Sequence, residues 1–200
     1  MRVLEFALAS LLIELTPGPN MAYLATLALA EGRRTGLAAV AGVMLGLAGI
    51  GLASMFGLAT LIQTVPVAYD GLRYAGAAFL LYLAWEAWRG AGEESGGGSG
   101  ARQAFRRALV TNLLNPKAAA FYVLVLPLFL TPEAGAVTGQ TLLLVLIYVI
   151  VATAVHAMIV LFAAALRPYL VEGPRERLVR RLLAVSIALV AVWFFWGTRR

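Results

Sequence analysis

The amino-acid sequence predicts an all-α membrane protein with six transmembrane helices, arranged as two inverted repeats of three helices each. Three observations lead to this fold class. Of the 200 residues, 62% are hydrophobic and only 13% are charged, which leaves too few polar residues to cover a soluble globule. Two stretches carry no charge over more than the roughly 20 residues that a helix needs to cross a bilayer. Two apolar segments, one in each half of the chain, are interrupted by proline.

The first predicted span, residues 3–30, is broken in its middle. The motif TPGPN at residues 16–20 places two prolines around a glycine. Because proline removes a backbone donor and clashes with the preceding turn, a continuous helix is not expected there. An alanine pair before the first loop is similar to a signal-peptidase site, but the long apolar stretch that leads to it favours a retained span.

The second and fifth predicted spans are the longest uncharged stretches, residues 36–62 and 134–166. The second contains Gly42 and Gly46 in a GxxxG arrangement, which predicts close helix packing without any ligand. The fifth contains one histidine, His156. Such a histidine more often bonds across helices than shuttles protons.

The third and sixth predicted spans, residues 72–83 and 182–198, share a pattern. Each is entered by an arginine, and tryptophans follow 12 and 15 residues later in both. Tryptophans at these places suit the headgroup interface. The four tryptophans are Trp85, Trp88, Trp193 and Trp196.

The fourth predicted span, residues 108–130, is the counterpart of the first because Asn115, Pro116 and Lys117 interrupt it. Before it lies a polar stretch rich in glycine, residues 90–105, which predicts a flexible linker. We therefore expect a single transporter domain over residues 1–200, with half-repeats 1–89 and 106–200.

The arginines predict the orientation in the membrane. Eleven arginines lie in the three connections on one side of the predicted helices and four on the other. The positive-inside rule then places both termini outside and three connections in the cytoplasm. The net charge of +6 is thus a topology signal, and no nucleic-acid partner is expected.

The two halves together predict alternating access. An odd number of spans in each half forces the halves into opposite orientations, related by an axis in the membrane plane. In transporters with this arrangement, the substrate site lies where the broken helices of the two halves face each other.

The first break offers groups for both ends of an α-amino acid. If Pro19 begins a new half-helix, the N–H groups of Asn20, Met21 and Ala22 point at the break and attract a carboxylate. The carbonyls that end the preceding half-helix, near Leu15 and Thr16, accept from an ammonium group. A plain proline kink without a ligand is the alternative.

Lys117 and Glu14 are the ionisable groups beside the breaks. A charge at mid-depth costs at least about 2.5–3.5 kcal/mol, so such a group usually has a partner and a function. We expect Lys117 and Glu14 to approach each other across the cavity, with substrate or proton binding altering their pairing. The alternatives are a Lys117 that reaches the headgroups and a Glu14 that makes a structural hydrogen bond.

These motifs carry a resemblance to a known family. TPGPN at 16–20 and NLLNPKAAAFY at 112–122 resemble the paired signature motifs of the LysE/RhtB family of bacterial amino-acid exporters. The glycines of the second span and the stretch GLRYAGAAFLLYLAW from Gly71 are similar as well. The resemblance implies a carrier of the bacterial inner membrane, often a homodimer, that exports amino acids or related metabolites by antiport with protons and needs no cofactor.

The resemblance and the two breaks together assign the site. The predicted substrate-binding residues are Thr16, Pro17, Gly18, Pro19, Asn20, Met21, Asn112, Asn115, Pro116 and Lys117, and proton coupling is assigned to Glu14 and Lys117. Two positions depart from the family pattern: Glu14 stands where members commonly have a small or uncharged residue, and Leu128 follows Pro127 where members have glutamine. The family's specificity therefore does not transfer to this chain.

Two other functions fit the sequence less well. Export of a metal or another inorganic ion would need a binding site with several ligands. The chain has few residues for such a site: one histidine, no cysteine and few intramembrane carboxylates. An intramembrane enzyme would need a nucleophile and base, or a metal pair. Glu14, Glu86 and His156 form no such signature, so neither a catalytic residue nor a bound metal is expected.

Overall fold

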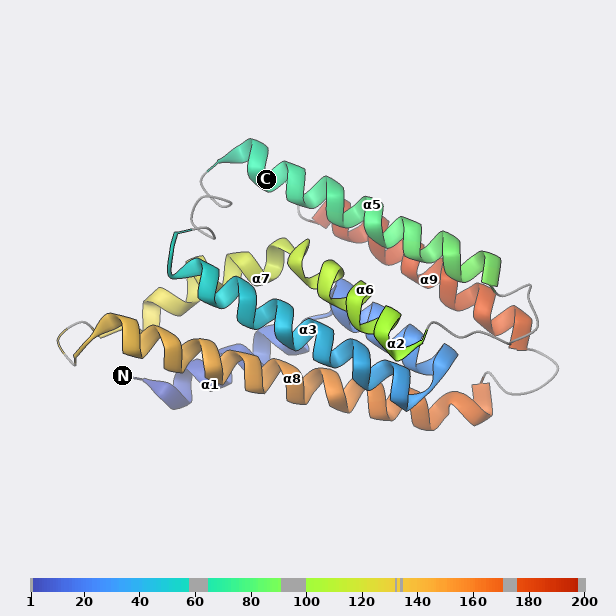
Figure 1. Cartoon of the computed structure of the whole chain (residues 1–200), viewed down its shortest axis with the longest axis horizontal. Helices are drawn as coiled ribbons and strands as arrows, with labels where there is room; N and C mark the ends of the chain where they lie inside the picture. The colour runs from blue at the N-terminus through green and yellow to red at the C-terminus, as the bar shows by residue number, and fades with distance from the viewer. Residues whose placement is uncertain are drawn as a thin grey trace.

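The computed structural model describes residues 2–57, 65–90, 100–131, 133, 135–170 and 176–197 (Figure 1). All regular secondary structure within these ranges is helical, which confirms the predicted all-α class. The α-helices are α1 (Val3–Leu15), α2 (Pro19–Glu31), α3 (Arg33–Ser54), α5 (Pro66–Gly90), α6 (Ala101–Leu113), α7 (Pro116–Ala120), α8 (Val137–Leu170) and α9 (Glu176–Gly197).

Both predicted breaks are present. The backbone between α1 and α2 is extended at Thr16 and Gly18, and Pro19 opens the new helix. In the second half, Asn115 caps α7 and Pro116 opens it, and the chain bends by 51° between α6 and the segment that follows. Proline suits the first helical position, where its missing N–H would have no intrahelical partner.

The helix after the second break is irregular. Behind α7 it widens into a π-helical turn, η1 (Phe121–Val125), and then tightens into a 3₁₀ turn, η2 (Leu126–Phe129). Isolated π turns occur often at functional sites. Here the π turn buries Phe121 and Tyr122.

Helices of one half pack mainly on helices of the other half. The first broken helix, α1 and α2, lies against α8, whereas α6 and α7 lie against α3. The last helices of the two halves, α5 and α9, lie side by side along one edge of the molecule (Figure 1). The main core therefore joins residues from both halves.

The outside of the molecule is apolar and its interior contains polar groups. One face of α1 exposes Leu4, Leu8 and Leu12, each by more than half. The buried polar or charged side chains of the described residues are Ser10, Glu14, Asn20, Thr26, Arg73, Thr111, Asn112, Asn115 and His156. This distribution is typical of a protein that faces lipid and satisfies its polar groups internally.

Two described helices, α3 and α8, are each long and apolar enough to cross a membrane, and the bent pair that begins with α6 would make a third. The six-span topology stays a prediction. Several helices extend beyond the apolar windows that predicted them: α5 begins at Pro66, and α8 continues to Leu170. Arginine and glutamate near these ends are good helix formers, so a charge ends an apolar window without ending the helix.

The boundary of the predicted linker at residues 90–105 was wrong at its far end. Residues 101–105 are helical and belong to α6. Ala104 is completely buried, because this first part of α6 packs closely on α3. Residues 91–99 of the predicted linker lie outside the described residues.

Glycines on α3 explain that close packing. A Cβ added at Gly42 would lie 2.2 Å from the carbonyl oxygen of Phe105, and one at Gly46 would lie 2.6 Å from Nδ2 of Asn112. The GxxxG prediction of a packing surface is confirmed. Gly49, on the same helix, has no atom within 4 Å of its added Cβ.

Candidate functional site

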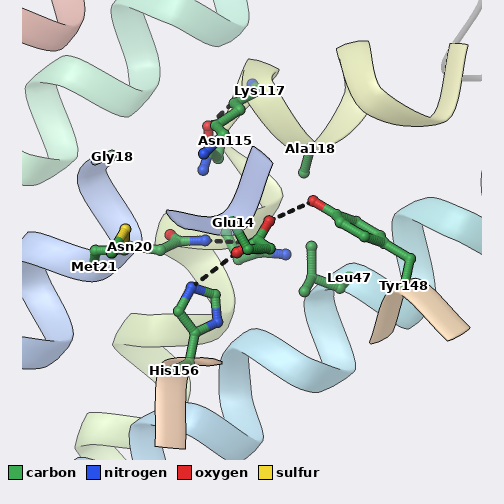
Figure 2. A pocket seen from close by; sticks show the side chains of 11 residues that line it. Glu14, Gly18, Asn20, Met21, Leu47, Asn115, Lys117, Ala118, Tyr148 and His156 are labelled. Atoms are coloured by element: carbon green, nitrogen blue, oxygen red, sulfur yellow. Dashed lines mark hydrogen bonds and ion pairs between the residues drawn. The ribbon is translucent and has the colours of Figure 1, made fainter. Parts of the chain in front are cut away.

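A small polar cavity lies where the break between α1 and α2 meets the break between α6 and α7 (Figure 2). Its volume is about 10 Å³, room for about one water molecule. The cavity is lined by Glu14, Gly18, Asn20, Met21, Leu47, Asn112, Asn115, Lys117, Ala118, Tyr148 and His156. Each half of the chain contributes its broken helix and one further wall.

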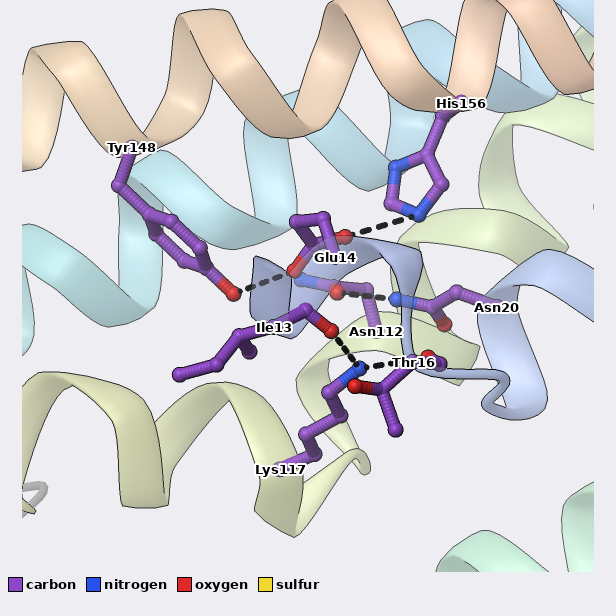
Figure 3. Close-up of polar contacts among 8 residues, drawn as sticks. All are labelled: Ile13, Glu14, Thr16, Asn20, Asn112, Lys117, Tyr148 and His156. Atoms are coloured by element: carbon purple, nitrogen blue, oxygen red, sulfur yellow. Dashed lines mark hydrogen bonds and ion pairs between the residues drawn. The ribbon is translucent and has the colours of Figure 1, made fainter. Parts of the chain in front are cut away.

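Glu14 is the buried carboxylate of this cavity, with only 5% of the residue exposed. Tyr148 donates its hydroxyl proton to Oε1 of Glu14 at 2.7 Å. Nε2 of His156 lies 3.3 Å from Oε2 of the same carboxylate (Figure 3). Both partners come from α8, which packs along α1. The carboxylate is thus held by two groups that are themselves able to carry a proton.

Two asparagines join the broken helices directly. Nδ2 of Asn20, in the first turn of α2, donates to Oδ1 of Asn112, near the end of α6, at 2.7 Å. Both side chains are buried. The bond leaves Oδ1 of Asn20 and Nδ2 of Asn112 without a partner among the described residues. One unpaired acceptor and one unpaired donor therefore remain at the contact between the two halves.

Lys117 reaches from the second break to the first. Its Nζ donates to the carbonyl oxygen of Ile13 at 2.7 Å and to that of Thr16 at 3.0 Å, as Figure 3 shows. The side chain therefore does not extend to the headgroups, which was one alternative. The backbone N–H of Lys117 donates to Oδ1 of Asn115, so Asn115 fixes the start of the short helix that carries the lysine.

The expected pairing of Lys117 with Glu14 is not present. Both residues line the cavity, but no ion pair joins them within the described part of the chain. Tyr148 and His156 already occupy the two oxygens of Glu14. The carbonyl oxygens of Ile13 and Thr16, at the negative end of α1, accept from the ammonium of Lys117 instead.

The other predicted site residues fall into two groups. Gly18, Asn20, Met21, Asn112 and Asn115 line the cavity. Those that do not line it shape the break: Thr16 supplies a carbonyl, Pro17 lies in the exposed connection, and Pro19 and Pro116 each begin a helix.

The N–H of Ala22 was expected to face the break, and this prediction was wrong. It donates instead to the carbonyl oxygen of Gly18 and makes the first bond of α2. Gly18 makes no side-chain cap, so the N–H groups of Asn20 and Met21 are the ones at the open end of this helix.

Sequence reasoning missed Tyr148 and assigned His156 only to a bond across helices. That bond exists, and its partner is Glu14. Tyr148 also stacks on Phe121, with ring centroids 3.9 Å apart, and so closes the wall beside Glu14. The available signal was the spacing: the two residues lie eight positions apart, about two turns, in a helix otherwise free of ionisable groups within the membrane.

The described residues hold no group of three or more histidine, cysteine, aspartate or glutamate side chains that could bind a metal ion. The cavity instead combines one carboxylate, one imidazole, one ammonium and three amides. These groups suit a small ligand that carries both a positive and a negative charge, because the cavity contains hydrogen-bond donors as well as acceptors.

An apolar exterior, long apolar helices and a polar centre at two helix breaks define a multi-pass helical membrane protein of the transporter type. The known family described as LysE type translocator matches residues 11–197. The chain belongs to this family, which confirms the resemblance seen in the two motifs.

Individual relatives agree with this assignment. The chain is 34% identical over 125 residues to a leucine efflux protein of Klebsiella pneumoniae, covering 60% of this chain and 59% of that one. It is 35% identical over 123 residues to a leucine efflux protein of an Enterobacter species, covering 59% of this chain and 58% of that one. The chain thus matches a little under three-fifths of the length of these two relatives.

A longer match is to an uncharacterized membrane protein of Pseudomonas aeruginosa, 31% identical over 166 residues. It covers 78% of this chain and 76% of that protein. No solved structure matches the chain.

Proposed function

We propose that this protein is a secondary exporter of amino acids or closely related small metabolites across the bacterial inner membrane. The observation that carries the proposal is the polar cavity between the two helix breaks, with acceptors for an ammonium group and donors for a carboxylate. Membership of the LysE type translocator family and the similarity to two leucine efflux proteins support it. Leucine is therefore the first substrate to test.

The two ends of an amino acid find different groups in the site. The carbonyls of Ile13 and Thr16, at the negative end of α1, accept from the ammonium. The first N–H groups of α2, at Asn20 and Met21, donate to the carboxylate. The unpaired donor on Asn112 and acceptor on Asn20 add a neutral contact for either end. A buried zwitterion is paired in this way at both charges, as burial requires.

Alternating access between two inverted repeats is the proposed mode of movement. The packing supports it, because the contacts are symmetric between the halves. The pair α1 and α2 of the first half packs on α8 of the second, just as α6 and α7 of the second half pack on α3 of the first. The helices α5 and α9 are equivalent and pack on each other. A rocking of one half against the other would then open the breaks to the cytoplasm and to the outside in turn.

Proton coupling is proposed at Glu14, with Lys117 as the nearby cation. A carboxylate with 5% exposure, held by Tyr148 and His156, suits a group that takes a proton when it faces the outside and releases it when it faces the cytoplasm. Release of the proton would leave a negative charge on Glu14 beside the site of the substrate's ammonium and would favour substrate binding. Uptake of a proton would remove that charge and favour substrate release.

The test is uptake of radiolabelled leucine by inside-out membrane vesicles. We expect a pH gradient that is acid inside the vesicle to drive accumulation, because the vesicle interior corresponds to the outside of the cell. Lys117→Ala and Pro19→Ala should each lower this uptake by about tenfold or more, the effect of losing roughly 1.4 kcal/mol.

Two matched variants serve as controls. Pro66→Ala changes the exposed first residue of α5, and Arg34→Ala removes an exposed cation near the start of α3; neither residue lines the cavity. Both should transport as the unchanged protein does. If Lys117→Ala and Pro19→Ala also left uptake unchanged, the site would be wrongly assigned.

A further inference from the structure

We propose that the ammonium group of Lys117 is a tethered stand-in for the ammonium of the substrate. In the empty carrier it occupies the site where the substrate's ammonium binds, and the substrate displaces it. This inference rests on the proposed function, and it assigns to the carbonyls of Ile13 and Thr16 a ligand class, primary ammonium groups. Three observations on the described residues carry it.

The first observation is the set of partners that Lys117 has. Its Nζ donates to two backbone carbonyls at 2.7 and 3.0 Å, and within the described ranges no carboxylate lies close enough for an ion pair. A lysine at a partly buried position inside a membrane protein usually pairs with an acid. This lysine instead completes the end of α1, where the carbonyl oxygen of Ile13 also accepts from the N–H of Thr16 at 3.1 Å and the negative end of the helix dipole favours a cation.

The second observation is the lack of space. The cavity holds about 10 Å³, about one water molecule, and leucine has nine non-hydrogen atoms. Loading must therefore move part of the wall. Lys117 is suited to move, because it sits on a flexible four-carbon stem and lies only partly buried.

The third observation is the place of the lysine relative to the first break. A Cβ added at Gly18 would lie 3.9 Å from both Cδ and Nζ of Lys117, so the ammonium lies directly beside the connection between α1 and α2. The groups that could receive a substrate's ammonium and those that hold Lys117 are the same carbonyls. Only one cation occupies them at a time.

The proposal has a consequence for the transport cycle. When the carrier returns without substrate, the carbonyl oxygen of Ile13 would keep only the N–H of Thr16 as its donor, and that of Thr16 would have no donor among the described residues, which is costly inside a membrane. Lys117 supplies the donors in the empty carrier, and the substrate supplies them in the loaded carrier. Removal of the lysine ammonium should therefore slow the return of the empty carrier more than exchange, in which the carrier is loaded in both directions.

The test compares net transport with exchange in liposomes that contain the full chain. Lys117→Met keeps the length of the side chain and removes its ammonium. We expect net leucine efflux to fall by at least about tenfold more than leucine counterflow, as two lost charge-assisted hydrogen bonds imply. Equal losses in both assays would overturn the proposal, because they would mark Lys117 as an ordinary contact to the substrate. Equal retention in both would overturn it too.

A second measurement does not depend on the identity of the substrate. Methylammonium should raise the thermal unfolding temperature of purified Lys117→Met, because it fills the vacated site, and should not do so for the unchanged protein. Tetramethylammonium, which has the same charge but no N–H donors, is the matched control. The proposal fails if methylammonium affects both proteins alike or neither.

The two measurements separate the proposals from each other. If the unchanged protein neither exports nor exchanges leucine while methylammonium still stabilises only Lys117→Met, the substrate is wrong and the ammonium site stands. If leucine is transported but methylammonium does not distinguish the two proteins, the proposed export stands and the stand-in is wrong.

Discussion

Glu14 shows how far a single residue of this site could be predicted from the sequence. Its position beside the first break made it a candidate from the sequence alone, because an ionisable group within a predicted span is rarely accidental. Its partners were not predictable in the same way. Tyr148 lies 134 positions further along the chain, and its spacing from His156 marks one face of α8 without indicating which helix that face meets.

The first residue-scale prediction concerns Glu14→Gln. Glutamine keeps the size of the side chain and an oxygen for the Tyr148 hydroxyl, but it neither takes nor releases a proton. We expect uptake driven by a pH gradient to fall to the level seen without a gradient. The measurement is initial leucine uptake in inside-out vesicles at several imposed pH differences.

Glu5 offers a matched control on the same helix. Its side chain is 58% exposed and pairs with Arg2 at 3.0 Å, so Glu5→Gln should retain the full response to the gradient. An undiminished gradient response in Glu14→Gln would show that the coupling proton is carried elsewhere.

At the scale of the elements, the breaks were predictable and their consequences were not. Prolines in TPGPN and at Pro116 correctly located both breaks, because the chemistry of proline acts locally. The π turn of η1 contacts α3 and stacks on Tyr148 of α8, and the early start of α6 packs on α3. Those contacts involve distant parts of the chain and leave no mark on the local composition. For this reason the polar composition of residues 101–105 predicted a linker.

The glycines of α3 give a prediction at the same scale. Gly42→Ala would place a Cβ 2.2 Å from the carbonyl oxygen of Phe105, and a backbone atom cannot turn aside as a side chain does. Overpacking of this kind costs about 1–3 kcal/mol. We expect a lower thermal unfolding temperature in detergent and weaker contact between α3 and α6.

Gly49 on the same helix is the control. Its added Cβ meets nothing within 4 Å, and alanine favours a helix over glycine by roughly 0.8–1 kcal/mol. Gly49→Ala should therefore unfold at the same temperature or slightly higher. Similar destabilisation by both substitutions would mean that the close approach of α6 does not limit stability.

For the whole molecule, the packing of each half on the other means that both halves contribute residues to the polar centre. Neither half contains both the carboxylate and its partners, since Glu14 belongs to the first and Tyr148 and His156 to the second. The sequence predicted two related halves from proline breaks and tryptophan spacing. It did not predict that the halves would pack chiefly on each other, because repetition specifies similar parts without specifying their contacts.

The orientation proposed for the whole molecule is testable because the chain has no cysteine. Arg34 and Glu133 are both exposed and lie on opposite sides in the predicted topology. In intact cells, a membrane-impermeant thiol reagent should label Glu133→Cys at once. It should label Arg34→Cys only after the membrane is permeabilised, and the reverse pattern would invert the topology.

The pairing of Glu14 with α8 also constrains the order in which the protein is assembled. Translation at about 5–20 residues per second delivers Tyr148 roughly 7–27 s after Glu14. The first broken helix must therefore enter the bilayer before its partners exist, whereas α6 emerges after α3 has been made. The contacts that hold Glu14 in the finished protein therefore form only after α8 has been made, when α9 alone of the described helices is still to come.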